Sequence, residues 1–63
     1  MKTKESILVM LLARLTELRE SNVKEDDPAL AGKLRGELEL LYEILGEDVP
    51  EEYWDAIESE IYY

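Results

Sequence analysis

The sequence predicts an all-α protein in which two long helices form an antiparallel hairpin and a short third helix follows. Leucine and other apolar residues recur at intervals of three and four, which is the spacing of one face of a helix. The first two such segments have similar lengths and are joined by a short polar stretch, as is typical of a helical hairpin. A chain of 63 residues is long enough for only one domain, so we expect a single small helical domain over residues 1–63.

The first helix is expected over about residues 3–22. Thr3 is a suitable N-cap, and the helix dipole favours the carboxylate of Glu5 in the first turn. The main apolar stripe of this helix consists of Ile7, Leu8, Leu11, Leu12, Leu15 and Leu18. Val9 and Met10 lie outside the stripe, so this part of the helix is apolar on nearly all sides. A single partner helix cannot cover so much apolar surface.

The second helix, about residues 28–45, has the clearest boundary signals. Asp27 is a capping residue, Pro28 stands where a missing N–H costs nothing, and Gly46 can adopt the left-handed conformation that ends a helix. The main apolar stripe consists of Ala31, Leu34, Leu38, Leu41 and Leu45. A second apolar row flanks it and consists of Leu30, Leu40 and Ile44. The polar residues 21–27 before this helix are expected to form a loop.

The third helix is expected over about residues 49–60. Pro50 and the acidic residues after it suit the first turn of a helix. The apolar ridge consists of Trp54, Ile57 and Ile61. A helix this short is marginal alone, so we expect it to dock on the other two, with Trp54 as its large anchor on the core. The neighbouring Tyr53 is a candidate partner-binding residue, because aromatic residues are frequent in binding hot spots.

The surplus of apolar surface predicts self-association. Two hairpins packed face to face would form a homodimeric four-helix bundle and cover this surface. The residues expected in the core or the dimer interface are Met10, Leu11, Leu15, Leu38, Leu41, Ile44 and Trp54. In its general plan this architecture resembles the small helical-hairpin dimers of plasmids and phages.

The composition argues against catalysis. The chain has no His and no Cys, which removes the commonest general base, the commonest metal ligand and any thiolate zinc site. No glycine-rich phosphate loop is present, and the acidic clusters lack the ligand spacing of a calcium loop. The apolar run at residues 7–13 is too short to span a membrane, and it has no signal-peptide cleavage pattern. We therefore expect a soluble cytoplasmic protein that is not an enzyme and needs no cofactor.

The net charge of −9 is concentrated in the second half of the chain. Residues 1–35 carry seven basic and six acidic side chains, whereas residues 36–63 carry ten acidic and no basic ones. Such a charge repels nucleic acid and anionic lipid and attracts basic protein surfaces. Glu39, Glu43 and Glu47 follow at intervals of four, which predicts one line along a helix. These carboxylates either imitate a nucleic acid backbone for a basic groove or form a solvated face.

Gly32 and Gly36 form a pair of small residues in the interior of the second predicted helix. Each glycine costs about 1 kcal/mol relative to Ala at such a position. Helical spacing places the pair opposite the main apolar stripe, where a soluble helix has no packing reason to keep glycine. Either another backbone approaches closely here, or the two glycines are neutral in a helix with stability to spare.

These features support two functional hypotheses. The leading one is a small acidic regulator or inhibitor, of the kind that phages and mobile elements encode, which occupies a basic surface of a host protein. The candidate partner-binding residues are Gly32, Gly36, Glu39, Glu43, Glu47 and Tyr53. The alternative is a structural or assembly module that self-associates. Neither hypothesis includes direct contact with nucleic acid or a membrane.

Overall fold

The computed structural model describes residues 3–62, and every regular element in this range is helical. The α-helices are α1 (Lys4–Glu20), α2 (Val23–Asp26), α3 (Pro28–Leu45) and α4 (Trp54–Tyr62). Two 3₁₀ turns, η1 (Gly46–Asp48) and η2 (Glu51–Tyr53), connect α3 to α4. The prediction of an all-α fold is confirmed. Residues 1, 2 and 63, at the ends of the predicted domain, lie outside the described part of the chain.

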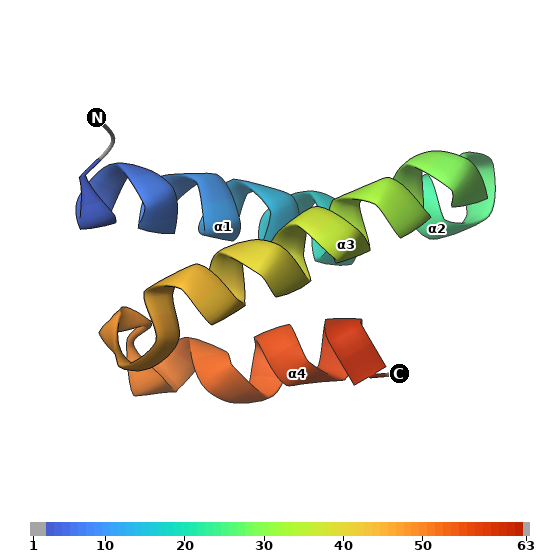
Figure 1. Cartoon of the computed structure of the whole chain (residues 1–63). Coiled ribbons are helices and arrows are strands. Elements are labelled where there is room, and N and C mark those ends of the chain that lie inside the picture. The colour runs from blue at the N-terminus through green and yellow to red at the C-terminus, as the bar shows by residue number, and fades with distance from the viewer. Residues whose placement is uncertain (1–2, 63) are drawn as a thin grey trace.

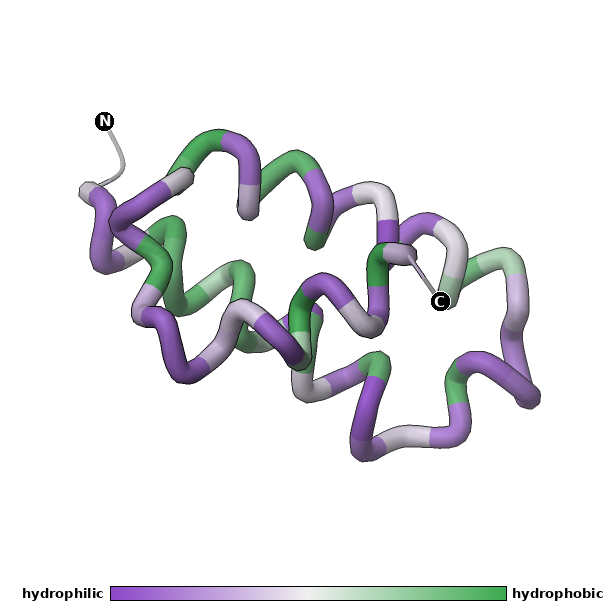
Figure 2. The backbone as a smooth tube through the Cα atoms, turned by 90° about the horizontal axis from the view of Figure 1, so that it is seen from below, coloured by the Kyte–Doolittle hydropathy of each residue, from purple (hydrophilic) through white to green (hydrophobic). Residues whose placement is uncertain are grey.

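The three longer helices surround a common core. α1 leads from the N-terminal end to α2, α3 returns past α1, and α4 follows along the other side of α3 (Figure 1). α3 contacts both α1 and α4, and α1 also contacts α4. Figure 2 shows hydrophobic residues recurring between hydrophilic ones along α3 and α4, as in amphipathic helices, whereas residues 7–13 of α1 are hydrophobic without interruption. The buried apolar residues are Leu11, Leu15, Leu18, Val23, Ala31, Leu38, Leu45, Val49 and Ile57.

α1 begins as predicted and ends two residues early. The Thr3 hydroxyl accepts a hydrogen bond from the Ser6 amide at 3.1 Å and so caps the first turn. Ser21 leaves the helix in an extended conformation, and its hydroxyl donates to the carbonyl oxygen of Glu17. The Ser21 amide donates to the same carbonyl at 3.3 Å, so the backbone and the side chain of Ser21 together cap the end of α1 at Glu20.

The prediction of a loop over residues 21–27 is wrong in part, because this segment contains the single turn of α2. The amides of Glu25 and Asp26 donate to the Asn22 carbonyl at 3.0 and 2.8 Å. The turn carries Val23 into the core, where the side chain is buried. Burial of one apolar residue therefore favours a helical turn over an open polar loop.

α3 spans Pro28–Leu45, the range that its boundary signals predict. Asp27 Oδ1 accepts a hydrogen bond from the Leu30 amide at 3.2 Å, and Pro28 occupies the first turn. Gly46 has a φ of 54°, and its amide donates to the Tyr42 carbonyl. Glycine adopts this left-handed conformation without steric cost, so both ends of α3 are determined locally.

α4 begins later than the predicted residue 49. Val49 and Pro50 are extended, with ψ angles of 124° and 136°, and η2 comes between them and the α-helix. Val49 is buried, and its carbonyl accepts a hydrogen bond from Trp54 Nε1 at 2.8 Å. The connection to α4 is therefore fixed by the burial of Val49 and by the indole of Trp54.

The residues predicted for the core or the dimer interface differ in their burial within the single chain. Leu11, Leu15 and Leu38 are buried as predicted. Met10, Leu41 and Trp54 are half-buried. Ile44 is 58% exposed, because Leu45 takes the core position at this end of α3. Ile44 is thus not a core residue of the single chain, and only its predicted place in a dimer interface remains.

Candidate protein-interaction surfaces

Two regions of the surface are the candidates for function. One is an acidic region where α3 meets α4, and the other is an apolar region between α1 and α3. Within residues 3–62, no group of three or more acidic side chains is arranged to hold a metal ion. No helix in the same range combines the length and the apolar character that crossing a membrane requires.

The acidic region consists of Glu39 and Glu43 on α3 and Glu58 on α4, and we name it the α3/α4 acidic surface. The Tyr42 hydroxyl donates a hydrogen bond to Glu58 Oε2 at 3.1 Å and so joins the two helices. Glu39 lies one turn before Tyr42 and one turn before Glu43 on α3. All three carboxylates are exposed, and none of them forms an ion pair with another described residue. They are therefore available to an external cation.

The predicted line of three carboxylates along α3 is wrong at its third member. Glu47 is exposed but lies in η1, beyond the left-handed Gly46 that ends α3. The helical interval of four therefore does not continue from Glu43 to Glu47. The next residue, Asp48, forms an exposed ion pair with Lys4 at 3.3 Å.

The phenol of Tyr42 is sensitive to the charge of this surface. Burial raises the pKa of Tyr42 above its ordinary value of 10.0. The hydrogen bond to Glu58 and the negative charges of Glu58 and Tyr62 raise this pKa further. Each of these effects favours the neutral phenol, so Tyr42 remains a hydrogen-bond donor to the acidic surface well into the alkaline range.

Gly32 and Gly36 lie on an open side of α3. Both are exposed, and a Cβ atom added at either position would meet nothing within 4 Å. Contact with the third predicted helix, which was one explanation for the pair, is therefore ruled out within the described chain. Helical spacing places Gly36 on the same side of α3 as Glu39 and Glu43. The glycines thus continue the α3 part of the acidic surface as a strip without side chains.

The aromatic residues Tyr53, at the end of η2, and Trp54, at the start of α4, pack against the core and are not part of the acidic surface. Tyr53 and Trp54 are both half-buried and pack against the core cluster. Trp54 occupies the position expected of an anchor. Tyr53, a predicted partner-binding residue, is less accessible than expected because the turn of η2 directs it inward.

The apolar region consists of Met10 on α1 and Leu40, Leu41 and Ile44 on α3, and we name it the α1/α3 apolar face. Leu40 and Ile44 are 57% and 58% exposed. A hollow of about 180 Å³ lies beside them, and it is lined by Met10, Arg14, Glu37, Leu40 and Leu41. This face confirms that the second apolar row of α3 has no cover within the described chain.

A pair of opposite charges lies at the edge of the hollow. Arg14 Nε is 3.9 Å from Glu37 Oε1, and an Arg14 guanidinium NH group donates to the Met10 carbonyl at 3.3 Å. The Arg14 Nε is buried and donates no hydrogen bond within residues 3–62. The hollow therefore combines apolar walls with one cation and one anion.

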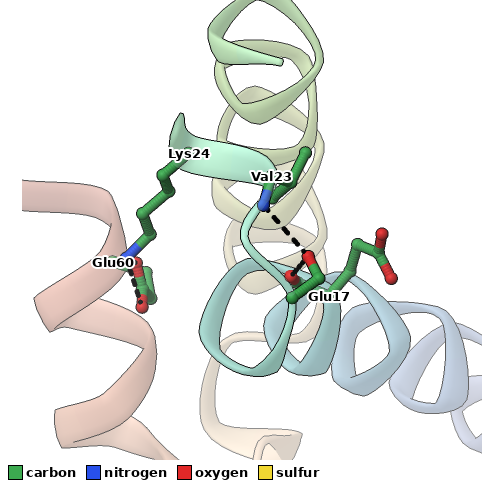
Figure 3. Close-up of polar contacts among 5 residues, drawn as sticks. Glu17, Val23, Lys24 and Glu60 are labelled. Carbon is green, nitrogen blue, oxygen red and sulfur yellow. Dashed lines mark hydrogen bonds and ion pairs between the residues drawn. The ribbon is translucent and has the colours of Figure 1, made fainter. Parts of the chain in front are cut away.

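Sequence reasoning missed the ion pair that joins α2 to α4. Lys24 Nζ lies 2.6 Å from Glu60 Oε2 and 2.9 Å from Oε1 (Figure 3). Glu60 is only 7% exposed. The one signal in the sequence is that Glu60 follows Ile57 by three residues, which places it on the apolar side of α4. Nothing in the local sequence indicates Lys24 as its partner.

Comparison of the chain with protein-family models, with curated proteins and with solved structures finds no match. Function is therefore inferred from the α3/α4 acidic surface and the α1/α3 apolar face.

Proposed function

We propose that this chain is a non-catalytic protein-binding module, a small regulator or inhibitor, whose α3/α4 acidic surface binds a basic surface of another protein. The observation that carries the proposal is that Glu39, Glu43 and Glu58 are exposed and form no ion pair within the described range. Glu58 accepts a hydrogen bond from the Tyr42 hydroxyl, which is neutral and leaves the negative charge uncompensated. The chain contains seven basic residues, and none of them neutralises these carboxylates within the described range. Concentrated charge of one sign accelerates encounter with a partner of opposite charge.

The open side of α3 supports the same proposal. Gly36 exposes the helix backbone beside Glu39 and Glu43, so side chains of a partner can approach α3 closely there. A basic groove that normally holds a nucleic acid backbone is a partner of suitable chemistry, because it binds rows of anions.

The test is capture of partners from a host lysate by the immobilised chain at a series of salt concentrations. The proposal predicts basic partners that bind at low salt and dissociate as screening increases. The double variant Glu39→Gln/Glu43→Gln should lose these partners. The matched control Glu5→Gln/Glu20→Gln removes two exposed carboxylates from α1 and should retain them. Equal capture by the two variants would refute a specific role of the acidic surface.

The α1/α3 apolar face favours a second candidate function, a self-associating assembly module. In this proposal α1 and α3 act as an antiparallel hairpin, and two hairpins form a homodimeric four-helix bundle. The supporting observation is the exposure of Leu40 and Ile44 beside a hollow. Association of this kind depends on apolar contact, so it should persist at high salt, unlike binding through the acidic surface.

A further inference from the structure

The α1/α3 apolar face contains a protruding row of apolar side chains and a hollow beside it, and a twofold interface can pair the two. A twofold axis joins one patch to a second copy of the same patch, so the patch has to be complementary to itself. Leu40 and Ile44 are successive exposed residues of one row along α3, and the hollow of about 180 Å³ opens beside them. A row of apolar side chains next to a hollow allows each copy to place its row in the hollow of the other.

The charges on this face are complementary to themselves as well. Arg14 and Glu37 lie side by side, with 3.9 Å between Nε and Oε1. A twofold axis that passes beside this pair reverses their order, so in such a dimer Arg14 of one copy would face Glu37 of the other. The side chains of Arg14 and Glu37 are 27% and 39% exposed, so part of each charged group is accessible to the opposite charge of a second copy.

We propose that a second copy of this chain binds the α1/α3 apolar face in a twofold arrangement. The proposal deepens the self-association candidate and does not depend on the α3/α4 acidic surface. The lining of the hollow contains one positive side chain, Arg14, and one negative side chain, Glu37. A second copy brings the same two charges, so each can meet its opposite. Helical spacing places the unpaired Glu39 on a different side of α3 from Leu41 and Ile44. Glu39 therefore lies outside the proposed interface and remains free for partners, whereas Glu43 lies between Glu39 and Leu40 around the helix and borders the interface.

The test is the oligomeric state of the full chain, measured by sedimentation equilibrium over a micromolar concentration series. The wild type should show twice the monomer mass. Leu40→Glu should raise the dimer dissociation constant by about a hundredfold or more. The reason is that each copy then buries one unpaired carboxylate in the interface. The control Val9→Glu adds the same charge at a residue that is 66% exposed and does not line the hollow. This variant should dimerise like the wild type.

A mixing experiment tests the charge arrangement separately. Arg14→Glu and Glu37→Arg, each alone, place like charges opposite each other across the axis and should weaken their homodimers. An equimolar mixture of the two variants should form a heterodimer more readily than either variant dimerises alone. Circular dichroism of each variant confirms that the helices are retained.

The outcomes separate this proposal from the acidic-surface proposal. A monomeric wild type throughout the series would overturn it and leave the face to a foreign protein or to solvent. Equal dimerisation of the Leu40→Glu and Val9→Glu variants, or no preference for the heterodimer, would also overturn it. Capture by the acidic surface is measured with Glu39→Gln/Glu43→Gln, which should leave the dimer intact, so either proposal can fail alone.

Discussion

Truncation of Leu38 tests the packing of the whole molecule most severely. Leu38 lies at the centre of α3 with no exposed surface, and its core cluster includes Leu11 of α1 and Ile57 of α4. Leu→Ala at a fully buried site costs about 2–5 kcal/mol, because apolar contacts are lost and a cavity remains. Natural domains have a total stability of about 5–15 kcal/mol, and small ones have little to spare. Leu38→Ala should therefore remove a large share of the folding free energy.

The assay is thermal unfolding followed by far-UV circular dichroism, with all proteins at one concentration because association affects the midpoint. A loss of 2 kcal/mol lowers the midpoint of a domain this small by at least about 8 °C. Leu30→Ala is the control, since it makes the same change on the same helix at a residue that is 39% exposed. Its midpoint should fall clearly less. If Leu38→Ala melts no lower than Leu30→Ala, α3 does not face the core through Leu38.

Three further predictions follow from single contacts. Gly36→Ala should raise the free energy of unfolding by up to about 1 kcal/mol, because the added methyl group meets nothing and Ala favours the helix. A lower free energy of unfolding in urea titration would instead indicate that another backbone packs against Gly36. Lys24→Ala should cost about 1–3 kcal/mol by leaving the buried Glu60 without its partner, and Glu60→Gln in that background should recover part of this loss. No recovery would argue against an unpaired carboxylate as the cause. The raised pKa of Tyr42 means that its proton contributes stability below pH 10.0, which is lost as pH rises through the folded-state pKa. Tyr42→Phe should lack this alkaline loss in urea titrations on either side of that pH, and equal losses in the two proteins would contradict the assignment.

The parts of the fold that were predictable from sequence depend on short-range chemistry. Asp27, Pro28 and Gly46 determine both ends of α3 through bonds and dihedral angles within a few residues. The cap of α1 at Thr3 is local in the same way. The exposure of Glu39 also follows from helical spacing alone, because it lies away from the apolar stripe.

The parts that were not predictable depend on contacts between distant segments. The ion pair of Lys24 with Glu60 joins residues 36 positions apart, and no local pattern indicates it. The late start of α4 depends on the burial of Val49, a tertiary effect that overrides local propensity. The wrong placement of Glu47 on the helix does not come from a contact between distant segments. Gly46 already marks the end of the helix in the sequence, so a line of carboxylates beyond it was never supported.

The proposed function requires that the exposed carboxylates of α3 bind a basic partner. The most direct measurement is the association rate of a captured partner with the wild type, with Glu39→Gln/Glu43→Gln and with the control Glu5→Gln/Glu20→Gln, each at two salt concentrations. We predict slower association and a flatter salt dependence for the α3 variant alone, with its helix content unchanged because Gln and Glu have similar propensities. An α3 variant that associates as fast as the wild type at both salt concentrations would contradict the claim.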